Sequence, residues 1–218
     1  MADKELLAYL ERFISVERKE RFQQVLAQRT RYLTIAMEDV FQLHNTSAAL
    51  RSCEAFGVQE LHLIEKRFGR RIDRKIAMGA ERWVDLYRHP DSRECLDTLK
   101  TRGYRIVATT PSPKACPLDE FSLHRPAALF FGTEKEGLSM EILEAADELL
   151  CIPMSGFTES LNVSVAASIV LYRLTSVLRK SDVPWELSEK EKLELQLKWT
   201  KRSIKSIQSI LNRYEQDA

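Results

Sequence analysis

The sequence is poor in residues that interrupt or cross-link a chain. Only 7 Gly and 7 Pro occur among 218 residues, which excludes a collagen-like or low-complexity chain. The 4 Cys residues show no Cys-x-x-Cys spacing, so we expect reduced thiols rather than disulfides or a zinc site. No apolar run approaches the roughly 18 residues that a membrane-spanning helix needs. The sequence therefore predicts one substantial core with appendages, no metal and no membrane segment.

Neither sign of charge is in excess. The chain has 33 basic and 32 acidic residues and a net charge of +1, so only a local patch could indicate binding to nucleic acid. Its first residues lack the apolar region of a signal peptide, which, with the reduced thiols, favours the cytoplasm. There is no G-x-G-x-x-G motif, so a dinucleotide cofactor is not favoured.

What the sequence does contain is an alternation of short apolar runs with amphipathic stretches. Strands are expected at 32–37, 61–64, 83–87, 104–109, 127–131 and 148–152, and helices at 45–56, 91–101, 139–146 and 160–178. Asn45 is expected to cap the first of these helices. Alternating strands and helices predict an α/β fold with a mostly parallel sheet and helices on both faces.

Both ends of the chain are predicted to be helical. Residues 3–29 show apolar positions at helical spacing, and a capping box at Ser188–Glu191 opens a final helix of about twenty residues. The apolar sides of these helices need a partner and provide one for each other. We expect an N-terminal extension at 1–29, a central domain at 30–180 and a C-terminal helix at 181–218 that packs on the extension.

Three of the predicted strands end in segments that suit ligand binding. Thr109, Gly132 and Ile152 each begin a loop, and ligands of open α/β sheets lie at the carboxyl ends of the strands. The loop after Ile152 is rich in hydroxyl, amide and backbone N–H groups, which would hold a ligand by shape and main-chain contacts. A Pro-Gly turn before a tightly packed core helix is the alternative interpretation.

A dense basic stretch lies between the second and third predicted strands. It has six basic residues in ten and includes an aromatic residue, Phe68. A solvated loop is one interpretation; a grip on RNA phosphates is favoured, because like charges repel one another. The candidate RNA-binding residues are Lys66, Arg67, Arg70, Arg71, Arg74 and Lys75.

Three stretches, in this order, resemble signature motifs of one enzyme family. Residues 45–57 match N-x-x-A-x-x-R…G, residues 132–139 match G-x-E-x-x-G-[LI]-[ST], and residues 152–166 match I-P-M-x-G-x-x-x-S-L-N-V-S-V-A. Together they resemble the SpoU class of RNA ribose 2′-O-methyltransferases, within the SPOUT superfamily. The resemblance covers about residues 30–180, and three motifs at compatible spacing are highly specific.

The resemblance implies a particular fold and cofactor. The family has a deep trefoil knot, here at about 109–172, whose loops bind S-adenosylmethionine (AdoMet) and form the core of a homodimer. By the same resemblance Thr109, Ile152 and Leu161 contact AdoMet through backbone groups. Gly132 and Met154 are implied to be wall residues, with Gly132 leaving room for the cofactor.

The resemblance also implies the catalytic residues. Arg51 matches the catalytic arginine, which should face the cofactor held by the other subunit, and Asn45 matches the residue that orients it. Ser160 and Asn162 match polar positions beside the reacting ribose. Glu134 matches a residue that orders the loops.

Resemblance to members that act on tRNA favours methylation of a ribose 2′-hydroxyl in tRNA, at a guanosine of the D-loop. Three alternatives stay open at this point: a ribosomal RNA methyltransferase, a non-catalytic RNA-binding protein on the same fold, and an unrelated flavodoxin-like binding module.

Overall fold

The structure, a computed structural model, describes residues 2–40, 42–66 and 72–217. It divides into two compact units, one made of Met1–Arg29 with Glu186–Ala218 and the other of Thr30–Trp185. Residues 181–185 therefore belong with the larger unit, where the hydroxyl of Thr30 donates to the carbonyl oxygen of Trp185 at 2.6 Å.

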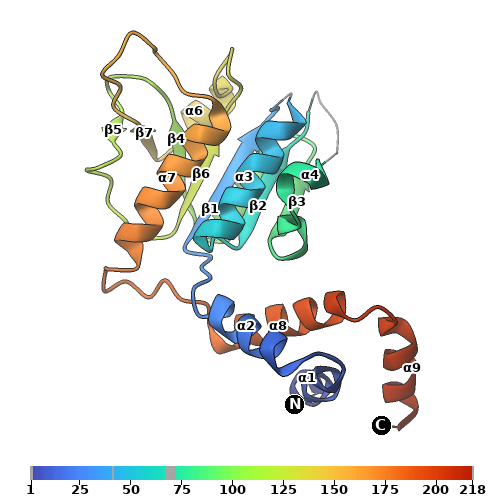
Figure 1. Cartoon of the computed structure of the whole chain (residues 1–218). Coiled ribbons are helices and arrows are strands. Elements are labelled where there is room, and N and C mark those ends of the chain that lie inside the picture. The colour runs from blue at the N-terminus through green and yellow to red at the C-terminus, as the bar shows by residue number, and fades with distance from the viewer. Residues whose placement is uncertain (1, 41, 67–71, 218) are drawn as a thin grey trace. The chain divides into compact units, whose positions relative to one another are not determined.

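One parallel sheet forms the centre of the larger unit (Figure 1). Within the described residues it has the strand order β3-β2-β1-β6-β4-β7-β5, and every neighbouring pair is parallel. The strands are β1 (Leu33–Glu38), β2 (Glu60–Ile64), β3 (Asp85–His89), β4 (Arg105–Thr109), β5 (Cys116–Pro117), β6 (Ala127–Phe131) and β7 (Glu148–Cys151). Because all strands point the same way, their carboxyl ends meet at one edge of the sheet.

Helices cover both faces of this sheet, as the sequence predicted. One face packs against α3 and α7, and the other packs against α5 and α6. The helices of this unit are α3 (Leu43–Phe56), α4 (Arg74–Ala77), α5 (Ser92–Thr101), α6 (Met140–Ala145) and α7 (Val163–Leu178), with a 3-10 turn η2 (Ala80–Arg82).

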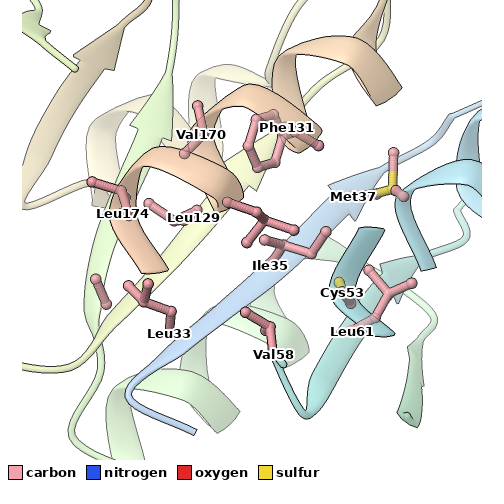
Figure 2. Close-up of a cluster of buried hydrophobic side chains, with 14 of the residues drawn as sticks. Leu33, Ile35, Met37, Cys53, Val58, Leu61, Leu129, Phe131, Val170 and Leu174 are labelled. Atoms are coloured by element: carbon pink, nitrogen blue, oxygen red, sulfur yellow. The ribbon is translucent and has the colours of Figure 1, made fainter. Parts of the chain in front are cut away.

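The central strands are buried on both sides, which explains their continuous apolar sequences. Ile35 of β1 faces Leu129 of β6 and the α7 side chains Val170 and Leu174 (Figure 2). The next residue, Ala36, points to the opposite face, where the side chains of α5 and α6 pack. Each fully buried aliphatic side chain of this kind contributes about 1.5–3 kcal/mol of transfer free energy.

The smaller unit is helical and has its own apolar cluster. It comprises α1 (Ala2–Leu10), a 3-10 turn η1 (Glu11–Phe13), α2 (Val16–Leu26), α8 (Glu189–Ser203) and α9 (Ile207–Asp217). Leu7 and Leu10 pack with Leu197, and Phe22 meets the buried Trp199 edge-on with ring centroids 5.7 Å apart. Among the described residues, every helix is too short or too polar to cross a membrane.

Several predicted helix boundaries were wrong. The predicted single C-terminal helix is two helices, because Ile204 adopts an extended conformation between α8 and α9. This break lets Ile204 and the apolar side of α9 both reach the cluster around Leu7. Asn45 is not a cap, since α3 begins at Leu43 with Gln42 in the N-cap position. Sequence patterns missed the short β5 and α4, and they placed the start of α7 too early.

Candidate active site

A pocket of about 410 Å³ opens at the carboxyl ends of β4, β6 and β7. Its walls come from the start of the loop after β4, the loop 132–138, the loop after β7 and the first turns of α7. All five residues predicted to bind the cofactor line it: Thr109, Gly132, Ile152, Met154 and Leu161. Their convergence from three strand ends is what the parallel topology requires.

The loop 132–138 is a tight turn held by its own backbone. Thr133 and Gly137 exchange two N–H···O hydrogen bonds of 3.0 Å each, and the hydroxyl of Thr133 accepts from the N–H of Glu136 at 3.0 Å. A Cβ atom on Gly132 would lie only 2.1 Å from the carbonyl carbon of Gly137. Glycine is therefore needed at position 132 because the turn leaves no space for a Cβ atom, whereas we had expected it to leave room for the cofactor.

The loop after β7 has no regular secondary structure until Asn162, which caps α7. The Asn162 side-chain oxygen accepts from the backbone N–H groups of Ser164 at 2.9 Å and Val165 at 3.3 Å. Ser160 and Leu161 precede this cap and lie on the pocket wall. Because the helix begins only after the Asn162 cap, these two residues lie outside it, and their backbone groups stay available to a ligand.

Asn45, Glu134 and Asn162 form a polar cluster beside the pocket. The Asn45 side-chain N–H donates to Glu134 Oε1 at 2.5 Å, and Asn162 donates to the same oxygen at 3.2 Å and to Asn45 Oδ1 at 3.0 Å. Asn45 is fully buried. This cluster joins α3, the loop 132–138 and the start of α7, the parts of the chain that carry the three motifs.

Arg51 lies on the exposed side of α3 and does not line the pocket of its own chain. It is six residues beyond Asn45, which separates them by about 9 Å along the helix axis. The side chain of Asn45 is engaged with Glu134 and Asn162, so within the described residues it does not orient Arg51 by a hydrogen bond. The expected role of Asn45 in orienting Arg51 stays a prediction.

The pocket wall carries more negative than positive side chains. Glu134, Glu136 and Glu159 line it, and Lys135 is the basic residue among its lining side chains. Carboxylates close to an apolar cavity favour a cationic ligand, since opposite charges attract more strongly where water is partly excluded. The arrangement can hold a positively charged group among main-chain and apolar contacts.

The basic stretch is only partly described. Lys66, Arg74 and Lys75 are exposed, and the last two lie in α4, which Asp73 caps through the N–H of Lys75 at 2.9 Å. Arg67, Arg70 and Arg71 lie outside the described residues. The prediction that all six bind RNA stays a prediction.

Among the described residues, three potential metal ligands gather on the other half of the sheet: His62, His89 and Cys95. His62 Nδ1 and His89 Nε2 share a hydrogen bond of 2.9 Å. Burial raises the pKa of the Cys95 thiol to about 12, so the thiol is neutral near pH 7. These contacts suit a core cluster, and the expected absence of a metal stays a prediction.

Sequence patterns missed Glu38, which ends β1 and accepts hydrogen bonds from Ser92 and Ser139. The signal was present, because an acidic residue directly follows a buried apolar run. The sequence interpretation ended the strand at residue 37 and left Glu38 in the following loop, where acidic residues are usually exposed to solvent.

The comparisons with known proteins bear on this site. The sequence model of the SpoU rRNA methylase family matches residues 32–172, well over half of the chain. The chain belongs to the SpoU family.

Individual members of the SpoU family are similar over most of their length. A tRNA (guanosine(18)-2′-O)-methyltransferase of Borreliella burgdorferi is 42% identical over 206 residues, which cover 94% of each chain. Another of that name, from Thermus thermophilus, is 41% identical over 155 residues, covering 71% of this chain and 80% of the relative. The solved structure of an A. aeolicus TrmH/SpoU tRNA modifying enzyme superposes with a TM-score of 0.77 at 34% identity. That match covers 86% of this chain and 97% of the other.

The matched SpoU region contains every residue that lines the pocket, together with Arg51 and Asn45. It leaves out α1, α2, α8 and α9. The Borreliella relative, in contrast, spans 206 residues of similarity, so its likeness extends into the smaller helical unit.

Proposed function

We propose that this chain transfers the methyl group of AdoMet to a ribose 2′-hydroxyl of tRNA, at a guanosine in the D-loop. The observation that carries the proposal is the pocket in which Thr109, Gly132, Ile152, Met154 and Leu161 converge. Membership of the SpoU family supports the reaction type, and the relatives named tRNA (guanosine(18)-2′-O)-methyltransferases support the substrate.

The pocket fits AdoMet in size and in chemistry. Its volume of about 410 Å³ falls in the range of roughly 300–1,000 Å³ that small-molecule sites occupy. Ile152, Leu161 and Val163 offer apolar surface for a nucleoside, and the three lining carboxylates suit a cationic sulfonium. When bound, AdoMet supplies an electrophilic methyl group that an alcohol oxygen can attack in line.

This chain's residues supply alignment and must handle one proton. The polar cluster of Asn45, Glu134 and Asn162 fixes the loops on two sides of the pocket, so they keep their shape when a ligand enters. Ser160, on the wall, offers a hydroxyl to the reacting ribose. Transfer of a methyl to a 2′-hydroxyl releases that hydroxyl's proton and leaves a neutral thioether.

Arg51 is the proposed catalytic residue, but it is a poor general base on physical grounds. A free guanidinium has a pKa of about 12.5–13.8, so only about one in a million is deprotonated at pH 7. A phosphate of the RNA beside Arg51 is ionised at pH 7 and can take the proton as the methyl group is transferred, while Arg51 holds phosphate and hydroxyl together through its planar fork. This role balances charge and uses the geometry of the guanidinium.

We also propose that two copies of the chain form the site. Arg51 is exposed on α3, and α7 beside it exposes three apolar side chains: Val165, Ile169 and Tyr172. The two helices are joined by a 2.7 Å hydrogen bond between Ser52 and Ser168. Exposed apolar side chains next to Arg51 suit an interface in which Arg51 reaches the pocket of the partner.

Three further expectations belong to this proposal. The chain between 109 and 172 forms the family's trefoil knot, the exposed Lys66, Arg74 and Lys75 contact RNA phosphates, and the enzyme acts in the cytoplasm on its tRNA. Residues 30–180 carry the catalytic domain. The terminal helices form an extension in which basic residues of α8 help to hold tRNA: Lys192, Lys198, Lys201 and Arg202.

The direct test is incubation with methyl-labelled AdoMet and unmodified tRNA, followed by nuclease mapping of the labelled ribose. Label at a D-loop guanosine is expected. Label in ribosomal RNA under the same conditions, with none in tRNA, would favour the ribosomal alternative. If calorimetric titration detected no AdoMet binding, a non-catalytic RNA-binding protein would be the better conclusion.

Mixed dimers test whether Arg51 acts across the interface. One chain carries Arg51→Ala and the other carries Leu161→Trp, which fills the pocket. Random mixing should restore roughly a quarter of wild-type activity, because half of the dimers are mixed and each has one complete site. If Arg51 serves its own pocket, no combination is complete and mixing restores nothing.

A further inference from the structure

Glu38 is a buried acidic residue that does not line the pocket. It is only 6% exposed and occupies the last position of β1. Its Oε1 accepts from the hydroxyls of Ser92 and Ser139 at 2.6 Å each, and its Oε2 accepts from the backbone N–H of Ser139 at 2.8 Å. No salt bridge joins Glu38 to a basic side chain in the part of the chain that the structure describes. In those residues its hydrogen bonds come from two hydroxyls and one backbone N–H.

The bonds to Ser139 replace an ordinary helix cap. Ser139 stands at the N-cap position of α6, where a serine hydroxyl usually accepts from a backbone N–H of the first turn. Here its hydroxyl makes no capping bond and donates to Glu38 instead. The Ser139 hydroxyl thus forms a hydrogen bond to Glu38 of β1 in place of a capping bond within its own helix.

Ser139 directly follows the loop 132–138, which forms one wall of the pocket. One contact within that loop and two attachments to other segments hold it: the close approach of Gly132 to Gly137, the bonds of Glu134 to Asn45 and Asn162, and the bonds of Ser139 to Glu38. The first two lie at the start and the middle of the loop. Glu38 secures its far end, where the chain turns into α6.

We infer that Glu38 is a positioning residue for the cofactor, which fixes the far end of the loop 132–138 in the conformation that binds AdoMet. The inference rests on the proposed function. A glutamine at this place would keep the shape of the side chain but would replace one acceptor oxygen by a donating NH₂ group. Its oxygen would accept from the Ser139 N–H and its NH₂ group would donate to the two serine hydroxyls, so the carboxylate's hydrogen bonds would be replaced by weaker bonds between neutral groups.

Ser92 and Ser139 provide a matched pair of variants. Both hydroxyls donate to the same oxygen of Glu38 at 2.6 Å, so their loss should affect stability alike. Ser92 begins α5, which does not line the pocket, whereas Ser139 continues from the pocket loop. A merely structural role would weaken AdoMet binding equally in the two variants, and a positioning role would not.

The experiment compares the full-length wild-type chain with Glu38→Gln, Ser139→Ala and Ser92→Ala. We expect Glu38→Gln to raise the Kd of AdoMet, measured by calorimetry, about tenfold, and Ser139→Ala to raise it a few-fold. Ser92→Ala should leave it unchanged, and kcat at saturating AdoMet should stay near wild type in all three. Hydrogen exchange of the amides at 133–139 should quicken in Glu38→Gln and Ser139→Ala but not in Ser92→Ala.

Equal AdoMet affinity in wild type and Glu38→Gln would overturn the inference, as would equal weakening in Ser92→Ala and Ser139→Ala. If Glu38→Gln does not fold, the comparison of the two serine variants decides by the same criterion. Absence of AdoMet binding by the wild type would overturn the proposed function instead. In that case unchanged exchange at 133–139 in Ser139→Ala would show that Glu38 does not fix the loop either.

Discussion

Replacing the three glycines of the motif loops by alanine should give three different outcomes. In Gly132→Ala the new Cβ lies 2.1 Å from the Gly137 carbonyl carbon and 2.4 Å from the Leu138 nitrogen. Ordinary contact begins near 3.4 Å, so the backbone must move by more than 1 Å. No side-chain rotation can relieve this overlap, because the atoms on the other side belong to the main chain.

The cost can be worked from the bonds that the movement breaks. Opening the turn removes the two 3.0 Å hydrogen bonds between Thr133 and Gly137, at about 0.5–1.5 kcal/mol each. Residual overpacking adds about 1–3 kcal/mol, so the free energy of unfolding should fall by about 3 kcal/mol. For Gly137→Ala the space is open but φ is +69°, and the left-handed conformation costs alanine about 1 kcal/mol.

Gly156→Ala is the matched control in the neighbouring loop. The nearest heavy atom to its new Cβ is 4.0 Å away, so its stability should stay within about 0.5 kcal/mol of wild type. Urea unfolding and thermal melting would measure the series, with Tm falling by about 6–12 °C for Gly132→Ala. AdoMet affinity should follow the same order. If Gly132→Ala and Gly156→Ala unfold at the same urea concentration, the close approach at Gly132 is refuted.

Three further predictions concern separate parts of the molecule. Arg51→Lys keeps the charge but loses the planar fork, so kcat should fall about 100-fold while the Kd of AdoMet is unchanged. Burial opposes ionisation of Glu60, but His62 Nε2 at 3.7 Å, the hydrogen bonds from Arg102 and the positive charges of Arg102 and Arg31 outweigh it and lower the Glu60 pKa to about 2. Because folding lowers this pKa, ionised Glu60 stabilises the folded state fully above about pH 4.5, and this stabilisation is lost as pH falls toward 2. Wild type should therefore lose about 3 kcal/mol relative to Glu60→Gln over that interval in denaturant unfolding. Ser188→Ala removes the capping box of α8 and should cost about 1 kcal/mol, with faster hydrogen exchange in its first turn.

Each of these predictions has a control of the same chemistry. Exposed Arg93 on α5, exposed Glu141 on α6 and exposed Ser209 on α9 allow the same three substitutions without the named contacts. Near-normal turnover of Arg51→Lys would remove its geometric role. A stability difference between wild type and Glu60→Gln that did not change with pH would contradict the lowered pKa. Unchanged exchange in α8 would show that the capping box contributes little.

The fold was largely predictable from local patterns, because the central strands are buried on both sides. Continuous apolar runs such as Ala127–Phe131 have no polar face, and only a sheet covered on both sides accommodates several of them. The two-residue strand β5 gave no such signal, since Cys116–Pro117 is too short to show a period. The longer strands could be predicted from their apolar sequences, whereas β5 forms only through its pairing with β7 in the folded chain.

Helix starts were less predictable, because the same side chains that cap helices also serve the site. Asn45 has the ideal chemistry for a cap, yet its amide is used by Glu134 and Asn162 and the helix begins before it. Ser139 likewise stands at a helix start but donates to Glu38. In both cases a contact between segments distant in sequence outweighs a local capping bond, and no local pattern contains that contact.

The pocket and the proposed catalytic arginine place different demands on the sequence. The pocket is shaped by backbone at three strand ends, so its essential side chains either admit close approach, as Gly132 does, or anchor a loop, as Glu38 and Glu134 do. Arg51, in contrast, is exposed and does not line the pocket of its own chain, so in the proposed dimer it would meet the cofactor of the partner. Sequence patterns missed Glu38, whose partners Ser92 and Ser139 lie far along the chain, and they identified Arg51 only through its resemblance to a family motif. The two kinds should separate in experiment, because damage to the pocket lowers cofactor affinity while damage to Arg51 lowers turnover with affinity retained.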